Sequence, residues 1–197
     1  MTHATTGRPR DPEVDRRIAL AAVAVFGEAG WAGFSVESVA RHAGVGKASI
    51  YLRWQTKEQL LLSALATHVT PVVDADTGTL RGDLVALARQ LVELYSGPSR
   101  QAALRMMLEA PIIPGLARRC DQLRQAQVTA ARAMVRRGIR RGDIDADTSV
   151  TLLLDTLGGG VIAHILSTPD HLADTVHARL DGFADQLVDF VLDPARP

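Results

Sequence analysis

Residues 35–62, SVESVARHAGVGKASIYLRWQTKEQLLL, hold two short helical patterns joined by a tight turn. Ser35 is a good helix N-cap residue, and the turn runs through Ala43, Gly44 and Val45. A further helix starts at Thr56, where Thr-Lys-Glu-Gln has the pattern of a capping box. Two short helices at a steep angle around a Gly-containing turn are an arrangement that lays one helix in the DNA major groove. The stretch therefore predicts a helix-turn-helix, for which the alternative is an ordinary pair of packed helices.

The second helix of the pair, from residue 46 or 47 to about residue 53, has the residue types that a recognition helix needs. Such a helix turns small, polar and basic side chains outward and is held by an apolar anchor. Ile50 is the expected anchor, with Trp54 packed behind it. The residues expected to contact DNA are Ser35, Arg41, Lys47, Ala48, Ser49, Tyr51, Leu52, Arg53 and Lys57.

The N-terminal residues are polar and have no periodic apolar pattern, which indicates a mobile arm. Arg8 and Arg10 lie in this arm, where an extended Arg-containing segment can follow a narrow minor groove. The alternative is a tail with incidental charge. Residues 1–57 hold eight Lys or Arg against five Asp or Glu, so a weak positive excess lies beside the expected DNA-binding unit in a chain of zero net charge.

The rest of the chain predicts helices only. Leu, Ala and Val dominate and aromatic residues make up 4% of the chain, which favours helices over a sheet. A first helix is expected from Asp11 to near Gly30, and the helix after Thr56 is expected to stop before Pro71. Five more are expected at about residues 80–95, 99–109, 114–141, 148–166 and 173–192. We therefore predict an all-α fold of about nine helices, with a linker at 72–79.

Several classes of site are not expected. Cys120 is the single cysteine, which excludes an internal disulfide framework and a Cys-based metal cluster. The six histidines have no recognisable metal spacing, and no enzyme motif is visible, so we expect neither a metal nor a cofactor. The N-terminus shows no apolar signal segment and nothing approaches the length of a membrane span, so we expect a cytoplasmic protein without a membrane partner.

The segment AGVGKASIYLRWQTKEQLLL resembles the DNA-binding signature of the TetR/AcrR family of bacterial transcriptional regulators, and the match covers about residues 12–70. The resemblance implies that Ser35, Lys47, Ser49, Tyr51 and Lys57 contact DNA. Two positions depart from the family pattern: Gly46 stands where a Ser cap is common, and Leu52 where a polar residue is frequent.

The same resemblance implies a domain organisation and a function. Residues 1–11 form a flexible arm, and residues 12–71 form a three-helix DNA-binding domain. A long helix joins this domain to a helical bundle, residues 72–197, for effector binding and dimerisation. The implied function is a ligand-responsive repressor that binds a palindromic operator in double-stranded DNA as a homodimer. A helical small-molecule-binding protein or an enzyme without a DNA role is the alternative.

Two further sets of residues are candidates for an effector pocket and for a dimer interface. An adaptable pocket for an apolar or amphipathic effector is predicted from Leu104, Met107, Leu108, Cys120, Leu123 and His164, against the alternative of plain helix core. A dimer interface is predicted where the last two helices cross closely, at Gly158, Gly159, Gly160, Phe183 and Phe190. Its alternative is a kink at the glycine run. The arginines of residues 132–141 are expected to lie on a solvated face or to pair with Asp143, Asp145 and Asp147.

Overall fold

The computed structural model describes residues 11–69, 72–97, 99–169 and 179–193. Arg8 and Arg10 therefore lie outside the described residues, as does the first part of the helix predicted from residue 173. Within the described residues every regular element is helical, which confirms the all-α prediction.

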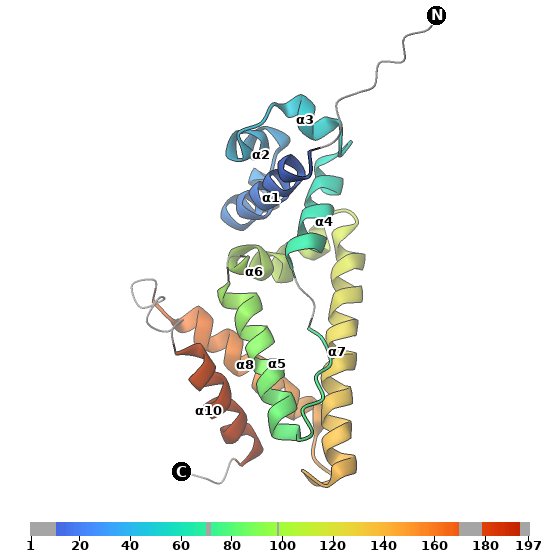
Figure 1. Ribbon diagram of the computed structural model, residues 1–197, viewed down its shortest axis with the longest axis vertical. Helices are drawn as coiled ribbons and strands as arrows, with labels where there is room; N and C mark the ends of the chain where they lie inside the picture. The colour runs from blue at the N-terminus through green and yellow to red at the C-terminus, as the bar shows by residue number, and fades with distance from the viewer. Residues whose placement is uncertain (1–10, 70–71, 98, 170–178, 194–197) are drawn as a thin grey trace, which may run out of the picture.

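The chain forms two groups of helices (Figure 1). The first group holds α1 (Pro12–Gly33), α2 (Val36–Ala43), α3 (Lys47–Tyr51) and α4 (Lys57–His68). The second holds α5 (Leu80–Ser96), α6 (Arg100–Glu109), the 3-10 turn η1 (Ala110–Ile112), α7 (Leu116–Arg141), α8 (Val150–Ser167) and α10 (Leu180–Leu192). These bounds agree with the predicted ranges to within two or three residues where both are described. The connection after α4 is irregular rather than helical, as the linker at 72–79 predicts.

The core of the first group extends beyond the predicted boundary at residue 71. Phe26, Ile50 and Leu61 have no exposed surface and lie at the centre of this core. The same core includes Ala102 of α6 and Leu116 at the start of α7. The helices of the first group therefore pack against α6 and the first turn of α7.

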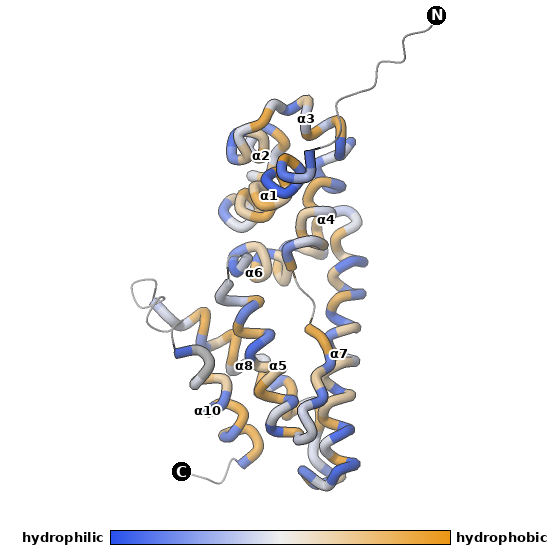
Figure 2. Tube along the Cα trace, in the orientation of Figure 1, coloured by the Kyte–Doolittle hydropathy of each residue, from blue (hydrophilic) through white to orange (hydrophobic). Residues whose placement is uncertain are grey.

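A second core lies between α5, α7, α8 and α10. Leu84, Met134, Leu157 and Val188 are fully buried there. Figure 2 shows that apolar residues recur along α5, α8 and α10. The connector between α4 and α5 also contributes, because Val72 is 6% exposed and packs against the same core. The connector is thus fixed to the second group rather than looped into solvent.

The glycine run does not kink α8, which is continuous from Val150 to Ser167. A Cβ at Gly160 would lie 2.9 Å from Leu187 of α10, so the close crossing of the last two helices occurs inside one chain. Gly158 and Gly159 would meet no atom within 4 Å. The kink alternative is therefore wrong.

The expectation that no segment approaches the length of a membrane span is wrong for α8. By length and composition alone, this helix of 18 residues is apolar enough to cross a membrane. Only 22% of it is buried, because Leu153, Leu157, Val161 and Ile165 form one covered face and the opposite face is open. The helix is thus a core helix with a second, bare face on which Leu152 and Leu166 are exposed together with Asp155.

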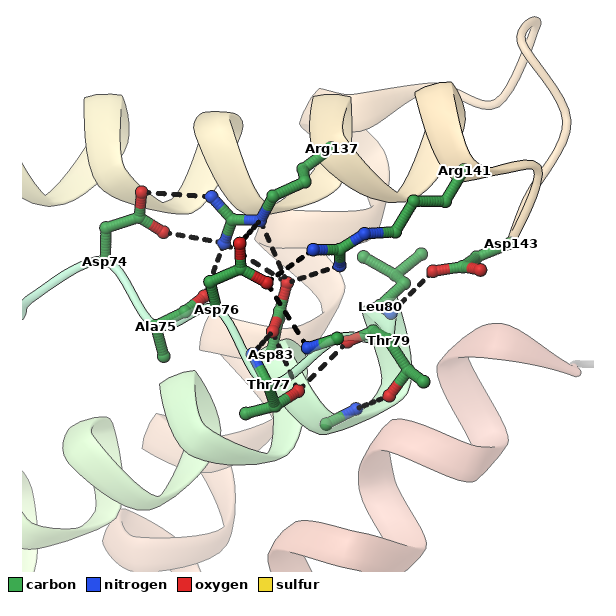
Figure 3. Close-up of polar contacts among 12 residues, drawn as sticks. Asp74, Ala75, Asp76, Thr77, Thr79, Leu80, Asp83, Arg137, Arg141 and Asp143 are labelled. Carbon is green, nitrogen blue, oxygen red and sulfur yellow. Dashed lines mark hydrogen bonds and ion pairs between the residues drawn. The ribbon is translucent and has the colours of Figure 1, made fainter.

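An ionic cluster fixes the connector to the far end of α7 (Figure 3). Its centre is Asp83, a carboxylate with no exposed surface. Asp83 accepts hydrogen bonds from Arg137 at 3.2 Å and from the backbone and hydroxyl of Thr77 at 2.6 and 2.8 Å. Because a buried carboxylate is stable only when it is paired and hydrogen-bonded, these partners fix the start of α5, the connector and α7 relative to one another.

The outer part of the cluster binds the connector itself (Figure 3). Asp74 pairs with Arg137 through two bonds of 2.9 and 3.1 Å, and Asp76 pairs with Arg141. Asp143 instead accepts from the backbone N–H of Leu80 at 2.7 Å. The expected pairing of the arginines with Asp143, Asp145 and Asp147 is therefore wrong for Arg137 and Arg141, whose partners lie more than 50 positions earlier in the chain.

Substitution of the central carboxylate tests this account. Asp83→Asn keeps the shape of the side chain but leaves Arg137 and Arg141 without their buried counter-charge. We expect it to lower the free energy of unfolding by roughly 3 kcal/mol. Asp147→Asn, an exposed acid with no described side-chain partner, is the matched control and should leave stability unchanged. Chemical denaturation of both variants measures the difference, and equal stability would contradict a structural role for the cluster.

Candidate nucleic-acid interface and internal cavity

The helix-turn-helix is built by local capping. The Ser35 hydroxyl accepts from the Ser38 backbone N–H at 3.1 Å, and the Ser38 hydroxyl accepts from the Ser35 N–H at 3.1 Å, which forms a reciprocal capping box. Gly44 ends α2 with φ of 63°, a left-handed conformation that favours glycine. Arg17 of α1 donates to the carbonyl oxygens of Ala43 and Gly44 and so holds the turn against α1. Sequence patterns gave no signal for this role of Arg17.

The recognition helix α3 is short and firmly anchored. Ile50 has no exposed surface and Trp54 packs against the same core, which confirms both predictions. Gly46 is the N-cap and supplies no side-chain hydrogen bond, as its sequence implies. Tyr51 and Leu52 remain 52% and 77% exposed, so α3 presents large side chains outward.

The remaining outward residues of α3 are small or charged. Lys47 and Ala48 are exposed, and Ser49 is half-buried. The ammonium of Lys47 lies 2.8 Å from a carboxylate oxygen of Glu37 on α2, and this hydrogen bond lowers the pKa of Glu37 and raises that of Lys47. Because both side chains are exposed, the pair can open when a phosphate competes for the ammonium.

Arg53 does not belong to the outward set. Its guanidinium pairs with Asp15 of α1 and donates to the carbonyl oxygen of Ser49 at 2.9 Å. Only 14% of the side chain is exposed. The predicted DNA contact at Arg53 is therefore corrected. Its guanidinium pairs with Asp15 instead and fixes α3 to α1.

Lys57 lies at the first turn of α4 and contacts Trp31 and the backbone of Phe34. Its ammonium is 3.8 Å from the centroid of the Trp31 ring and donates to the carbonyl oxygen of Phe34 at 3.3 Å. Thr56 caps α4 by accepting from the Gln59 N–H at 3.2 Å. The Gln59 side chain returns to the N–H of Gln55 rather than that of Thr56, so the predicted box is displaced by one residue.

The N-terminal ends of α2 and α4 meet in a shallow hollow of about 250 Å³. Ser35, Tyr51, Thr56 and Lys57 all line it. Free backbone N–H groups at a helix N-terminus, together with a lysine, form a setting suited to a phosphate. The hollow therefore combines donor groups suited to a phosphate with one exposed carboxylate, that of Glu37.

A separate cavity of about 440 Å³ lies between α5, α6, η1 and α7. Met107, Cys120 and Leu123 line it, in agreement with three of the six predicted pocket residues. Tyr95 and Met106 also line it and were not predicted. Burial raises the pKa of the Tyr95 phenol and of the Cys120 thiol, so both groups are neutral at pH 7.

The other three predicted pocket residues lie elsewhere. Leu104 packs against the second core, and Leu108 is 80% exposed on the outer face of α6. His164 stacks on Phe183 of α10, with ring centroids 3.9 Å apart. The pocket assignment is therefore corrected at these positions, because each helix turns them away from the cavity.

Two family models match the chain. The model described as "Bacterial regulatory proteins, tetR family" matches residues 18–64, and the one described as "Tetracyclin repressor-like, C-terminal domain" matches residues 74–191. The chain belongs to the TetR family. Its members are transcriptional regulators rather than enzymes, so the chain is a DNA-binding transcriptional regulator.

Individual regulators of similar sequence or fold agree with this assignment. The chain is 32% identical over 173 residues to the regulator AqdR of Rhodococcus erythropolis, covering 87% of this chain and 82% of AqdR. It is 30% identical to the DNA-binding transcriptional repressor TetR of Mycobacteroides abscessus, covering 84% and 89%. The fold resembles FadR of Bacillus subtilis in complex with stearoyl-CoA, with a TM-score of 0.67 at 17% identity over 92% of this chain and 99% of FadR.

The inward position of Arg53 leads to a test on stability. Arg53→Ala removes the ion pair to Asp15 and should lower the free energy of unfolding by about 2 kcal/mol. Arg41→Ala, on the exposed surface of α2, is the control and should leave stability unchanged. Thermal or chemical unfolding of the two variants separates the roles. If Arg53→Ala is as stable as wild type, Arg53 is not a structural residue.

Proposed function

We propose that this TetR-family regulator is a ligand-responsive repressor that binds a palindromic operator as a homodimer in the cytoplasm. The observation that carries the proposal is the joint position of Tyr51, Ser35 and Lys57 around one hollow beside α3. A TetR-family relative at 30% identity is named a transcriptional repressor, which supports the direction of regulation.

In the proposed complex, α3 lies in the major groove and the ends of α2 and α4 face the phosphates. Lys47, Ala48, Ser49, Tyr51 and Leu52 then face the bases or the adjoining backbone. The exposed Leu52 is suited to the methyl group of a thymine. Ser35, Arg41 and Lys57 face phosphates, with the Ser35 contribution coming mainly from the helix end because its hydroxyl is used in the capping box.

The bare face of α8 supports dimerisation. Leu152 and Leu166 are 67% and 62% exposed, and the exposed residues Asp155, Thr156, Gly159 and Ala163 lie between them on the same helical stripe. Phe190 of α10 is 61% exposed. The small residues Gly159 and Ala163 let a second helix approach closely, so a second copy of the chain can cover the leucines across a two-fold axis, with Asp155 at the edge of the contact.

A two-fold dimer accounts for a palindromic operator. Two α3 helices related by this symmetry read two half-sites in successive major grooves, about 34–36 Å apart. A ligand regulates binding only if it favours a dimer state in which this spacing no longer matches the DNA.

Helix α6 links the cavity to the DNA-binding helices. Ala103, Met106 and Met107 line the cavity. From the same helix, Arg105 donates to the carbonyl oxygens of Gly27 and Glu28 of α1 at 2.7 and 3.0 Å. An effector that displaces the methionines therefore moves the helix that holds α1. FadR of Bacillus subtilis was solved with stearoyl-CoA, which supports a small-molecule effector in this fold.

Removal of the Tyr51 ring tests the DNA-binding face. Tyr51→Ala should weaken binding to the operator by roughly tenfold, because the ring is exposed on α3 and supports no core packing. Leu108→Ala is the control, since it removes an exposed apolar side chain far from α3. The operator is first selected from genomic DNA, and affinity is then measured by fluorescence anisotropy. Unchanged affinity of Tyr51→Ala would remove this contact from the proposal.

A charge on the bare face of α8 tests the dimer. Leu152→Glu should raise the dimer dissociation constant by roughly a hundredfold, because the symmetric interface buries two unpaired carboxylates. Leu108→Glu is the control with the same chemical change on an exposed apolar residue. Sedimentation velocity measures the molecular mass of both variants. A dimeric Leu152→Glu protein would place the interface elsewhere.

A further inference from the structure

We infer that the cavity between α5, α6 and α7 takes an amphipathic anion, with an apolar body inside and a carboxylate or phosphate group on Arg124. The inference rests on the proposed effector role of this cavity and names the chemistry of its ligand. It is carried by the position of one exposed ion pair at the mouth and by the residues behind it.

The interior of the cavity suits an apolar body. Leu94, Ala103, Met106 and Leu123 line it, and methionine side chains adapt to ligands of irregular shape. Tyr95 is 8% exposed and also lines the cavity. Among the described residues no hydrogen bond is formed by its phenol, so this group can bind one polar atom of a ligand that enters deeply.

The mouth of the cavity is marked by Asp121 and Arg124, which pair one turn apart on α7. Both residues line the cavity, and both also line a neighbouring open hollow of about 500 Å³ beside Gln125, Val128 and Thr129. The pair therefore stands where the apolar interior meets the protein surface. A ligand with its body inside must place its head group beside these two side chains.

The Arg124 guanidinium favours an anionic head. Arg124 and Asp121 are the two charged residues that line the mouth, so each can pair with a head group of the opposite charge. Of the two, the guanidinium offers the larger set of hydrogen-bond donors, and its planar shape matches a carboxylate or phosphate. The side chains of Arg124 and Asp121 are 69% and 58% exposed, so their mutual bond is weak in water and can be exchanged. A ligand carboxylate can then take the place of Asp121 and bind the planar guanidinium through two hydrogen bonds.

Three probes that share a ten-carbon chain and differ in the head group test the inference: decanoate, decanol and decylamine. Cys120 is the single cysteine, so its rate of alkylation by a maleimide reports occupancy of the cavity directly. We expect decanoate to protect Cys120 at about tenfold lower concentration than decanol, and decylamine to protect least. Decyl phosphate, in a parallel titration, shows which anionic group is preferred. Equal protection by decanoate, decanol and decylamine would overturn the inference.

Matched variants test whether Arg124 is the residue that binds the head group of the ligand. Arg124→Gln should weaken protection by decanoate about tenfold and leave protection by decanol unchanged. Asp121→Asn frees Arg124 and should strengthen protection by decanoate. Arg118→Gln, an exposed arginine of the same helix that does not line the cavity, is the control. Unchanged decanoate protection in Arg124→Gln would overturn the role of Arg124, and circular dichroism of each variant establishes that it is folded.

Operator binding, measured on the same samples, separates this inference from the proposed function. If decanoate binds through Arg124 and operator affinity does not change, the ligand chemistry stands and the ligand-responsive role of the cavity fails. If ligand-free protein binds the operator and no probe protects Cys120, the inference fails while the DNA-binding function stands.

Discussion

The buried carboxylate of Asp83 determines how the DNA-binding helices are attached to the rest of the protein. A carboxylate without contact to water is stable only with its charge balanced and its oxygens hydrogen-bonded. Arg137 and Thr77 provide this, so the connector must follow α7 rather than leave it. The other end of α7 begins at Leu116, inside the core of the first helical group. One end of α7 thus shares a core with α4, and the other end binds the connector that follows α4. A shift of α7 would therefore act on both α4 and the connector.

A second constraint acts at Gly30, where α1 breaks with φ of 64°. A Cβ at this position would lie 2.6 Å from side-chain atoms of Arg105 and Glu109, so α6 approaches α1 as closely as glycine allows. The break turns the N–H of Trp31 toward the Glu109 carboxylate, 2.7 Å away, and this bond is the main cause that lowers the pKa of Glu109. The ring of Trp31 in turn supports Lys57. A continuous set of contacts thus joins the cavity helix to the lysine at the proposed phosphate site.

The sequence was informative where structure depends on neighbours in the chain. Caps at Ser35 and Thr56 and the turn at Gly44 are decided within a few residues, and the buried Ile50 follows from helical spacing. Helical spacing predicts which face of a helix is buried, but not which other element covers that face. Arg53 faces Asp15, 38 positions earlier, and Arg137 faces Asp83, 54 positions earlier. His164 is predicted to be a pocket residue because it is a polar group on an apolar helix, and its actual stacking partner, Phe183, lies on another helix that no local pattern pairs with it. These pairings depend on how helices pack, which no local pattern contains.

The zero net charge of the chain is compatible with DNA binding once the ion pairs are placed. Arg16, Lys47 and Arg53 each have an acidic partner within the first helical group, which leaves the positive excess on a few residues near the turn and the start of α4. Within residues 11–69, few cations without an acidic partner remain for phosphates, and this favours weak non-specific attraction to DNA. One half-site then supplies limited affinity, and high affinity requires both α3 helices of the proposed dimer to bind together. In the proposed dimer the spacing between the two α3 helices therefore matters more than any single contact, and we propose that a small displacement of α6 or α7 is the change that releases the operator.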